Sequence, residues 1–106
     1  MKTFNRRQIV GAAKRIIKNV AELPLSEIRI ESDPRNDLSI DSLDVWNLLY
    51  ECEQKFDMAI PDEEVNKFNT LKDGVDYIHD ELFKQGRAPK PRIARAVAEA
   101  AAGNGR

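Results

Sequence analysis

Apolar residues recur with helical spacing at the start of the chain. Asn5 and Gln8 have the spacing of a capping box, which predicts a helix that begins near residue 5. The helix should end around Ala21, before Pro24, and its other side carries most of the local cations. Its apolar face comprises Ile9, Ala12, Ala13, Ile16, Ile17 and Val20.

A second helical stretch runs from Ser42 to Phe56. Its apolar stripe is wide, as expected for a helix that packs on two neighbours. We therefore expect Trp46 and Tyr50 to belong to the core, with Tyr50 reaching toward the surface. The stripe comprises Leu43, Trp46, Leu48, Leu49, Tyr50, Cys52 and Phe56.

Two more helices are predicted after residue 60. Pro61 followed by three acids suits the first turn of a brief helix near residues 62–67. Thr70 and Asp73 resemble another helix start, and a fourth helix should reach about Phe83. Gly74 inside this helix predicts a close contact, because glycine weakens a helix. No stretch alternates like a strand. The predicted fold is all-α, a four-helix bundle with three main helices and a short third one.

A long connection, residues 22–41, separates the first two helices. Loops of this length that lack their own secondary structure are usually functional or pinned to the core. Here apolar residues are spread along the loop, so we expect it to be pinned across the core. These anchors are Leu23, Leu25, Ile28, Ile30 and Leu38.

The length of 106 residues fits one domain. Residues 1–84 should form the helical domain. From residue 85 glycine and proline become frequent, and an alanine-rich segment follows with little to bury. We therefore expect residues 85–106 to be a flexible, basic tail.

The reactive side chains are few. One cysteine and one histidine exclude an intramolecular disulfide and leave little for metal or triad chemistry, so neither a metal site nor enzymatic activity is expected. Cys52 lies on an apolar stripe and should be a small buried residue, whereas His79 should be solvated. The first ten residues lack an apolar stretch, and no apolar run approaches the roughly 20 residues of a membrane span. We expect a cytoplasmic protein without stable membrane insertion.

The net charge of −1 conceals three unlike segments. Residues 1–30 hold seven Lys or Arg and two Glu, a net +5. Residues 31–83 hold fifteen acids and four cations, a net −11, and residues 84–106 return to +5. An acidic centre favours basic partners and repels nucleic acid. We expect a monomer that does not bind nucleic acid.

The most informative string is Asp37-Leu38-Ser39-Ile40-Asp41-Ser42-Leu43-Asp44. It places Ser42 at the first turn of a helix, directly after the long loop. Serine is a preferred helix cap, so Ser42 could serve only as a cap. The flanking acids disfavour a noncovalent anion site and suit the docking of a basic enzyme that modifies the hydroxyl.

Asp41-Ser42-Leu43-Asp44 resembles the D-S-L-D/E attachment motif of the acyl carrier protein family. Phe56-Asp57, the string Ile60-Pro61-Asp62-Glu63-Glu64 and Asp76-Tyr77-Ile78 extend the resemblance, which covers about residues 5–83. It implies that Ser42 receives 4′-phosphopantetheine from coenzyme A. The thiol of this group would carry an acyl chain as a thioester, and the protein itself would not be an enzyme.

The resemblance also implies an acyl-chain pocket, docking residues and partners. The pocket positions are Leu48, Leu49, Cys52, Ile60, Val65, Phe68 and Ile78. The docking positions are Asp41, Leu43, Asp44, Glu51, Glu53, Glu63 and Glu64. The implied partners are a phosphopantetheinyl transferase and synthases, ligases or acyltransferases with basic docking patches, acting in fatty-acid or specialised lipid synthesis.

Several positions depart from the family pattern. Ser39 replaces a common glycine, Pro34 replaces an apolar aromatic residue, and Asn47, Gln54 and Lys55 replace acids. These departures favour a specialised bacterial-type carrier. The absence of paired glycines before Ser42 favours fatty-acyl cargo. The alternatives are a carrier for a polyketide or aminoacyl unit, or a noncovalent helical interaction domain.

Overall fold

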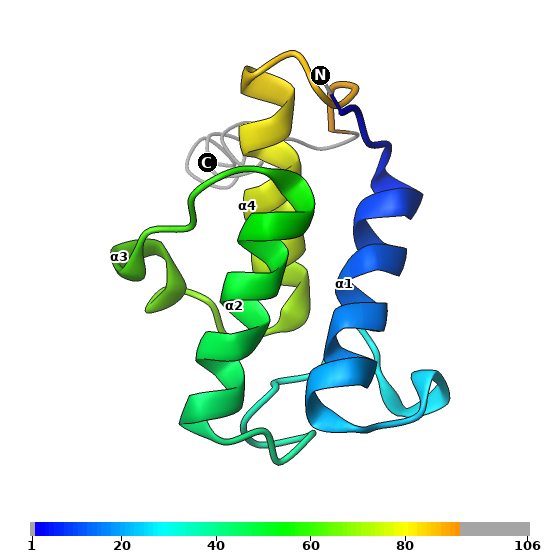
Figure 1. Cartoon of the computed structure of the whole chain (residues 1–106), viewed down its shortest axis with the longest axis vertical. Coiled ribbons are helices and arrows are strands. Elements are labelled where there is room, and N and C mark those ends of the chain that lie inside the picture. The colour runs from blue at the N-terminus through cyan, green and yellow to red at the C-terminus, as the bar shows by residue number, and fades with distance from the viewer. Residues whose placement is uncertain (1, 92–106) are drawn as a thin grey trace, which may run out of the picture.

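The computed structural model describes residues 2–91, and in this part of the chain every regular element is helical. Figure 1 shows α1 running antiparallel to α2 and α4, with the short α3 on the side away from α1. The predicted four-helix bundle is confirmed. The elements in order are α1 (Arg6–Ala21), the 3-10 helix η1 (Leu25–Glu27), α2 (Ser42–Phe56), α3 (Asp62–Val65) and α4 (Leu71–Lys84).

Capping boxes begin α1 and α4, as the sequence predicted. The Gln8 N–H donates to Asn5 Oδ1 at 2.8 Å, and the Asn5 N–H donates back to Gln8 Oε1 at 2.9 Å. At α4 the Asp73 N–H donates to Thr70 Oγ1 at 3.3 Å, and the Thr70 N–H donates to Asp73 Oδ2 at 3.1 Å. These bonds satisfy N–H groups that have no partner within the helix.

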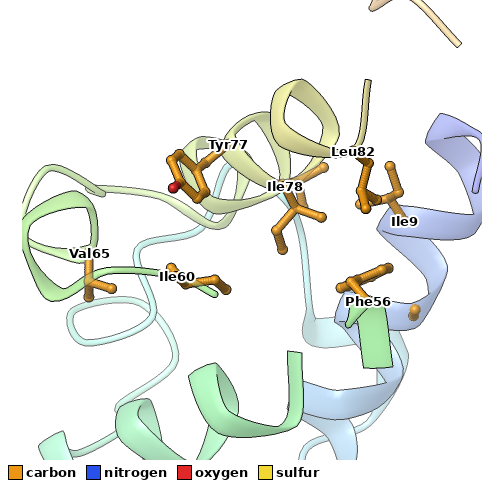
Figure 2. Packing of buried hydrophobic residues seen from close by; sticks show 9 residues of the cluster. Ile9, Phe56, Ile60, Val65, Tyr77, Ile78 and Leu82 are labelled. Atoms are coloured by element: carbon orange, nitrogen blue, oxygen red, sulfur yellow. The ribbon is translucent and has the colours of Figure 1, made fainter. Parts of the chain in front are cut away.

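The larger hydrophobic cluster lies where α1, α2 and α4 meet. Figure 2 shows the side chains of Ile9, Phe56 and Leu82 converging from these three helices, and all three are fully buried. Ile60 and Val65 extend the cluster toward α3. This packing brings the end of α2 next to the start of α1 and the end of α4.

A second cluster pins the long loop to the other end of the bundle. Ile28 and Ile40 of the loop are buried against Ile17 of α1 and Leu48 of α2. The expected pinning is therefore present, with one exception. Leu25 is 46% exposed and is not an anchor, and no residue of η1 is buried.

Arg87 is buried in the described structure, although its segment was expected to be flexible. Its Nε donates to the Lys2 carbonyl at 2.9 Å, one Nη donates to the Asp57 carbonyl at 3.0 Å, and the other donates to the Phe56 carbonyl. Phe56 and Asp57 end α2, so a cation sits at the negative end of the helix dipole. The Phe4 N–H also donates to the Arg87 carbonyl at 2.8 Å. Arg87 thus joins both ends of the described chain to α2.

His79 is also buried, at 3% exposure, so the expectation of a solvated side chain was wrong. Its ring bridges two partners. Arg6 Nη1 lies 3.5 Å from Nδ1, and the Pro89 carbonyl lies 2.9 Å from Nε2. An Nε2–H tautomer satisfies both contacts. Residues 86–91 therefore pack on the helices, where the sequence indicated the start of a tail. The remainder of that predicted tail, residues 92–106, lies outside the described residues.

A polar contact also links α1 to α4. Arg6 Nη2 lies 2.6 Å from Asp76 Oδ1, and Lys72 Nζ lies 2.8 Å from Asp76 Oδ2. Burial alone would raise the pKa of Asp76, but the hydrogen bonds and charges of Lys72 and Arg6 outweigh it, and the pKa is lowered. Asp76 is therefore ionised near neutral pH and holds the two helices together.

Two smaller findings complete the fold. A methyl group added at Gly74 would lie 3.8 Å from the Phe68 ring, an ordinary contact, so the close approach predicted there was wrong. Among residues 2–91 no helix has both the length and the apolar character needed to span a bilayer.

Candidate functional site

The start of α2 presents Ser42 to solvent. Asp41, not Ser42, caps the helix, and its Oδ1 accepts a hydrogen bond from the Asp44 N–H at 2.9 Å. Ser42 is the first helical residue and is exposed. Within the described part of the chain its hydroxyl has no hydrogen-bond partner, so the interpretation of Ser42 as a simple cap was wrong. The hydroxyl is free to react.

The loop before Ser42 is held by a hub at Asp33. Asp33 Oδ1 accepts hydrogen bonds from the N–H groups of Arg35 and Asn36 at 2.9 and 3.2 Å. Hydrogen bonds from Asn36 and Arg35 hold the pKa of Asp33 below its usual value. The Asp33 N–H in turn donates to Asp37 Oδ2 at 2.8 Å. The Asp33 carboxylate therefore stays ionised, and the hydrogen bonds of this hub fix the turn that leads to α2.

The same loop is fastened to the start of α4. The Leu71 N–H donates to the Ser32 carbonyl at 3.0 Å, and the Lys72 N–H donates to the Ile30 carbonyl at 2.6 Å. These two N–H groups belong to the first turn of α4, where no partner exists within the helix. The loop thus connects α4 to the segment that positions Ser42.

Ser39 adopts a left-handed backbone conformation, with φ of 56°. In the family pattern that the motif resembles, this position is commonly glycine. The structure shows that the turn forms with serine at this position. A residue that has a side chain destabilises the fold by about 1 kcal/mol or more when it adopts this left-handed conformation.

Replacing Ser39 with glycine is expected to raise the free energy of unfolding by about 0.5–1 kcal/mol, because glycine adopts positive φ without strain. Urea denaturation measures this change. Ser26→Gly is the matched control, since Ser26 is also exposed but has no positive φ. It should lower stability by a similar amount. A loss of stability in Ser39→Gly equal to that of the control would contradict the argument.

A cavity of about 230 Å³ lies between α1, α2, α4 and the segment around α3. Its lining is mainly apolar. Ala13 and Ile17 of α1 and Val75 of α4 contribute to the wall, although the sequence did not single them out for it. All seven residues proposed from sequence for an acyl-chain pocket line this one cavity: Leu48, Leu49, Cys52, Ile60, Val65, Phe68 and Ile78.

Cys52 faces this cavity from α2. Burial, together with the neighbouring Glu51 and Glu53 carboxylates, raises the pKa of its thiol to about 12. At neutral pH the thiol is therefore protonated and is a poor nucleophile. The sequence predicted a small buried residue, and the side chain is half-buried on the apolar face of α2 that lines the cavity.

The acids that the sequence predicted as docking positions differ in exposure and in hydrogen bonding. Asp41, Glu51 and Glu63 are exposed. Asp44 is half-buried at the first turn of α2. Glu53 is not free, because its Oε2 accepts a hydrogen bond from the Ile60 N–H at 2.7 Å and fixes the link after α2.

The remaining docking positions predicted from the sequence are Glu64 and Leu43. Glu64 forms an ion pair with Lys67 at 2.8 Å. Leu43, directly after Ser42, is 69% exposed.

Trp46 and Tyr50 are not core residues, contrary to the expectation from the apolar stripe. They are 50% and 58% exposed. The side of α2 that packs inward carries Leu48 and Phe56, whereas Trp46 and Tyr50 lie on the uncovered side. Spacing identified an apolar helix face but did not reveal that no neighbour covers part of it.

Comparison with known proteins identifies the family. The family described as "Phosphopantetheine attachment site" matches residues 12–78. The acyl carrier protein of Coprothermobacter proteolyticus is 38% identical over 80 residues, which cover 76% of this chain and 98% of that relative. The acyl carrier protein of Acidothermus cellulolyticus is 36% identical over 75 residues, covering 71% of this chain and 89% of that relative.

A third relative, the acyl carrier protein of Rubrobacter xylanophilus, is 38% identical over 75 residues, covering 71% of this chain and 93% of its own length. The matches cover nearly the whole of each of these three relatives. The chain belongs to the acyl carrier protein family, whose members are carriers rather than enzymes and bear 4′-phosphopantetheine as a covalent cofactor.

Proposed function

We propose that Ser42 is the residue to which 4′-phosphopantetheine is attached and that this carrier serves fatty-acid or specialised lipid synthesis. The free, exposed hydroxyl of Ser42 is the observation that carries the proposal. Asp41 performs the capping that a serine at a helix start often performs, so Ser42 can be modified without loss of the cap. When attached, the group supplies a thiol that carries the acyl chain as a thioester.

The surroundings of Ser42 suit this role. The Asp33 hub and the bonds from the loop to α4 hold the start of α2 in place. No nucleophile or base is needed from this chain beyond the hydroxyl, because a phosphopantetheinyl transferase performs the reaction with coenzyme A. The chain's own residues position the hydroxyl and leave it accessible.

The cavity is the proposed shelter for the acyl chain. An apolar cavity of about 150 Å³ holds a benzene molecule, so about 230 Å³ offers room for part of an acyl chain. Leu48 and Ile78 provide apolar walls on α2 and α4. This lining suits a fatty-acyl cargo.

Exposed acids are the proposed contacts for basic partner enzymes. Asp41, Glu51 and Glu63 are accessible, and Leu43 offers an apolar contact beside Ser42. The segment from residue 31 to residue 83 has a net charge of −11, which supports attraction of a basic docking patch. We place this monomeric carrier in the cytoplasm, in keeping with its single cysteine.

Attachment at Ser42 is tested by intact mass spectrometry after incubation with coenzyme A and a broad-specificity phosphopantetheinyl transferase. We expect wild-type protein to gain one phosphopantetheine group. Ser42→Ala should gain none. Ser39→Ala is the matched control, because Ser39 lies in the same loop three residues earlier, and it should be modified like wild type. An unmodified wild type beside a modified reference carrier would overturn the proposal.

Reversing two exposed acids is expected to slow attachment. Glu51→Lys combined with Glu63→Lys should lower the loading rate at low salt by about tenfold, because both charges then repel a basic patch. Added salt should slow the wild-type reaction as well. Glu27→Lys with Glu31→Lys, also exposed but in the loop after α1, makes the same change in charge and should have little effect. Equal slowing by both pairs would show that only net charge matters.

A further inference from the structure

The outer side of α1 carries four cations along one face. Arg7, Arg15 and Lys18 are exposed, and Lys14 is half-buried. At about 100° per residue the four positions fall within roughly 100° of arc, on the side opposite the buried residues of α1. They extend over about 17 Å of helix. We call Arg7, Lys14, Arg15 and Lys18 the α1 basic face.

The α1 basic face is unpaired in a chain that is rich in acids. The sequence holds 18 Asp or Glu, but these gather between residues 31 and 83, where the net charge is −11. Within residues 2–91 no ion pair involves a cation of this face, whereas the neighbouring Arg6 is paired with Asp76. The four charges are therefore available to an anionic partner.

Gly11 lies in the middle of the α1 basic face and lets its charges gather. The Arg15 guanidinium folds back over this glycine, because a Cβ atom at Gly11 would lie 3.4 Å from Arg15 Nη1. Glycine inside a helix is unfavourable, and so are like charges one turn apart, as at Lys14 and Lys18. Locally unfavourable choices of this kind are typical of functional sites.

The composition of the α1 basic face favours a lipid surface over a protein or a nucleic acid. Protein interfaces commonly have an apolar or aromatic centre that is depleted of charge, and the centre of this face is a glycine among cations. Proteins that bind single-stranded nucleic acid without reading its sequence stack bases on aromatic side chains, and this face has none. Anionic lipid headgroups, in contrast, attract lysine and arginine by charge alone.

The acids of the chain do not cancel this attraction. Figure 1 shows α3, whose first turn holds Asp62, Glu63 and Glu64, on the side of the bundle away from α1. The molecule measures 41 × 36 × 27 Å along its principal axes. Charges in water are largely screened beyond about 8 Å at physiological salt. A bilayer that meets α1 is therefore screened from the acids of α3.

We propose that the α1 basic face holds this protein reversibly at the surface of an anionic lipid bilayer, with its cations against the headgroup phosphates. Each lysine or arginine near such a surface strengthens binding roughly fivefold, so four give a partition coefficient on the order of 10³ M⁻¹. The contact goes beyond the proposed function and does not require Ser42. It places a carrier of acyl chains beside the membrane that receives lipids.

The first test is co-sedimentation of the full chain with vesicles at low salt and about 5 mM lipid, where the expected partition coefficient leaves most of the protein bound. Wild type should bind vesicles of phosphatidylcholine with about 30% phosphatidylglycerol, but not vesicles of phosphatidylcholine alone. About 0.5 M NaCl should release it. Arg7→Glu combined with Arg15→Glu should lower the partition coefficient at least twentyfold, because two attractive charges become repulsive.

A matched pair separates the α1 basic face from net charge. Lys55→Glu combined with Lys67→Glu makes the same change in charge at exposed positions outside α1, and it should bind within about twofold of wild type. Thermal unfolding should show that both double variants remain folded, as expected for exposed positions. Equal loss of binding in the two double variants would mean that only net charge matters, and the inference would be overturned.

The second test observes the orientation of the bound protein. Nanodiscs of the same two lipids, with a gadolinium chelate on some headgroups, should broaden the amide NMR signals of residues 7–18 more than those of residues 62–65. This order is expected because α3 lies away from α1 (Figure 1). Uniform broadening, or stronger broadening of α3, would contradict the proposed contact.

The remaining outcomes identify other partners and keep this inference separate from the proposed function. Wild type that stays in the supernatant with anionic vesicles overturns the inference and leaves attachment at Ser42 untouched. It is also overturned if Arg7→Glu with Arg15→Glu dissociates an oligomer seen by ultracentrifugation, or if wild type binds a short DNA duplex more tightly than the vesicles. Ser42→Ala should bind vesicles like wild type. Wild type that binds vesicles but is never loaded would leave this inference standing and overturn only the proposed function.

Discussion

Replacing Arg87 with alanine is expected to lower the free energy of unfolding by about 3 kcal/mol, one of the largest effects predicted for this chain. The buried guanidinium donates to the carbonyls of Lys2, Phe56 and Asp57, which come from two distant parts of the sequence. Hydrogen bonds to a charged group contribute about 1.5–3 kcal/mol each, and their loss leaves carbonyls without donors. Urea denaturation followed by circular dichroism measures the change.

Two further variants make the measurement specific. Arg87→Lys keeps the charge but not the planar fork that reaches several carbonyls, so it should recover only part of the stability. Arg29→Ala removes an exposed arginine and should change stability by less than about 0.5 kcal/mol. Equal effects of Arg87→Ala and Arg29→Ala would show that the contacts of Arg87 do not stabilise the fold.

Arg87 also illustrates what the sequence could not reveal. Its neighbours Gly86 and Pro89 are typical of a linker, and arginine is rarely buried. The carbonyls that bind it are brought together only when α2 ends beside the first residues of the chain. No local pattern encodes that meeting, so the sequence predicted a flexible segment where the structure has a fixed one.

Local signals in the sequence, in contrast, correctly predicted where α1 and α4 begin. The pairs Asn5 with Gln8 and Thr70 with Asp73 satisfy helix N–H groups within three residues, so spacing alone was sufficient to predict them. Ser42 was also singled out from its immediate neighbours, and its role as the attachment residue stays a prediction. The residue that caps α2 was not predicted, because Asp41 and Ser42 are both good caps and only the backbone geometry distinguishes them.

Helical spacing predicted the apolar faces of α2, but it could not predict which parts of these faces are covered by other elements of the fold. Leu48 and Phe56 are buried, whereas Trp46 and Tyr50 on the same helix are exposed. Apolar residues spaced at about 3.6 positions indicate that their side chains lie on the same face of a helix. This spacing does not indicate whether another helix packs against that face.

Cys52 is expected to react with iodoacetamide roughly a thousandfold more slowly than an ordinary thiol at pH 8. Alkylation requires the thiolate, and a pKa of about 12 in place of 9.0 reduces its amount by about that factor. The rate should rise about tenfold for each pH unit between pH 7 and pH 9, because the folded thiol stays far below its pKa throughout. Intact mass measured against time gives the rate.

A matched thiol on the same helix separates burial from intrinsic reactivity. Cys52→Ala combined with Gln54→Cys moves the thiol two residues along α2 to an exposed position, where we expect an ordinary rate. Urea should bring the wild-type rate to the same level. Because Cys52 lines the cavity, an acyl chain attached at Ser42 and sheltered there should slow its alkylation further. The same rate for Cys52 and the residue-54 thiol in the folded protein would mean that the cavity admits water freely, and it would remove the support for a sheltered chain.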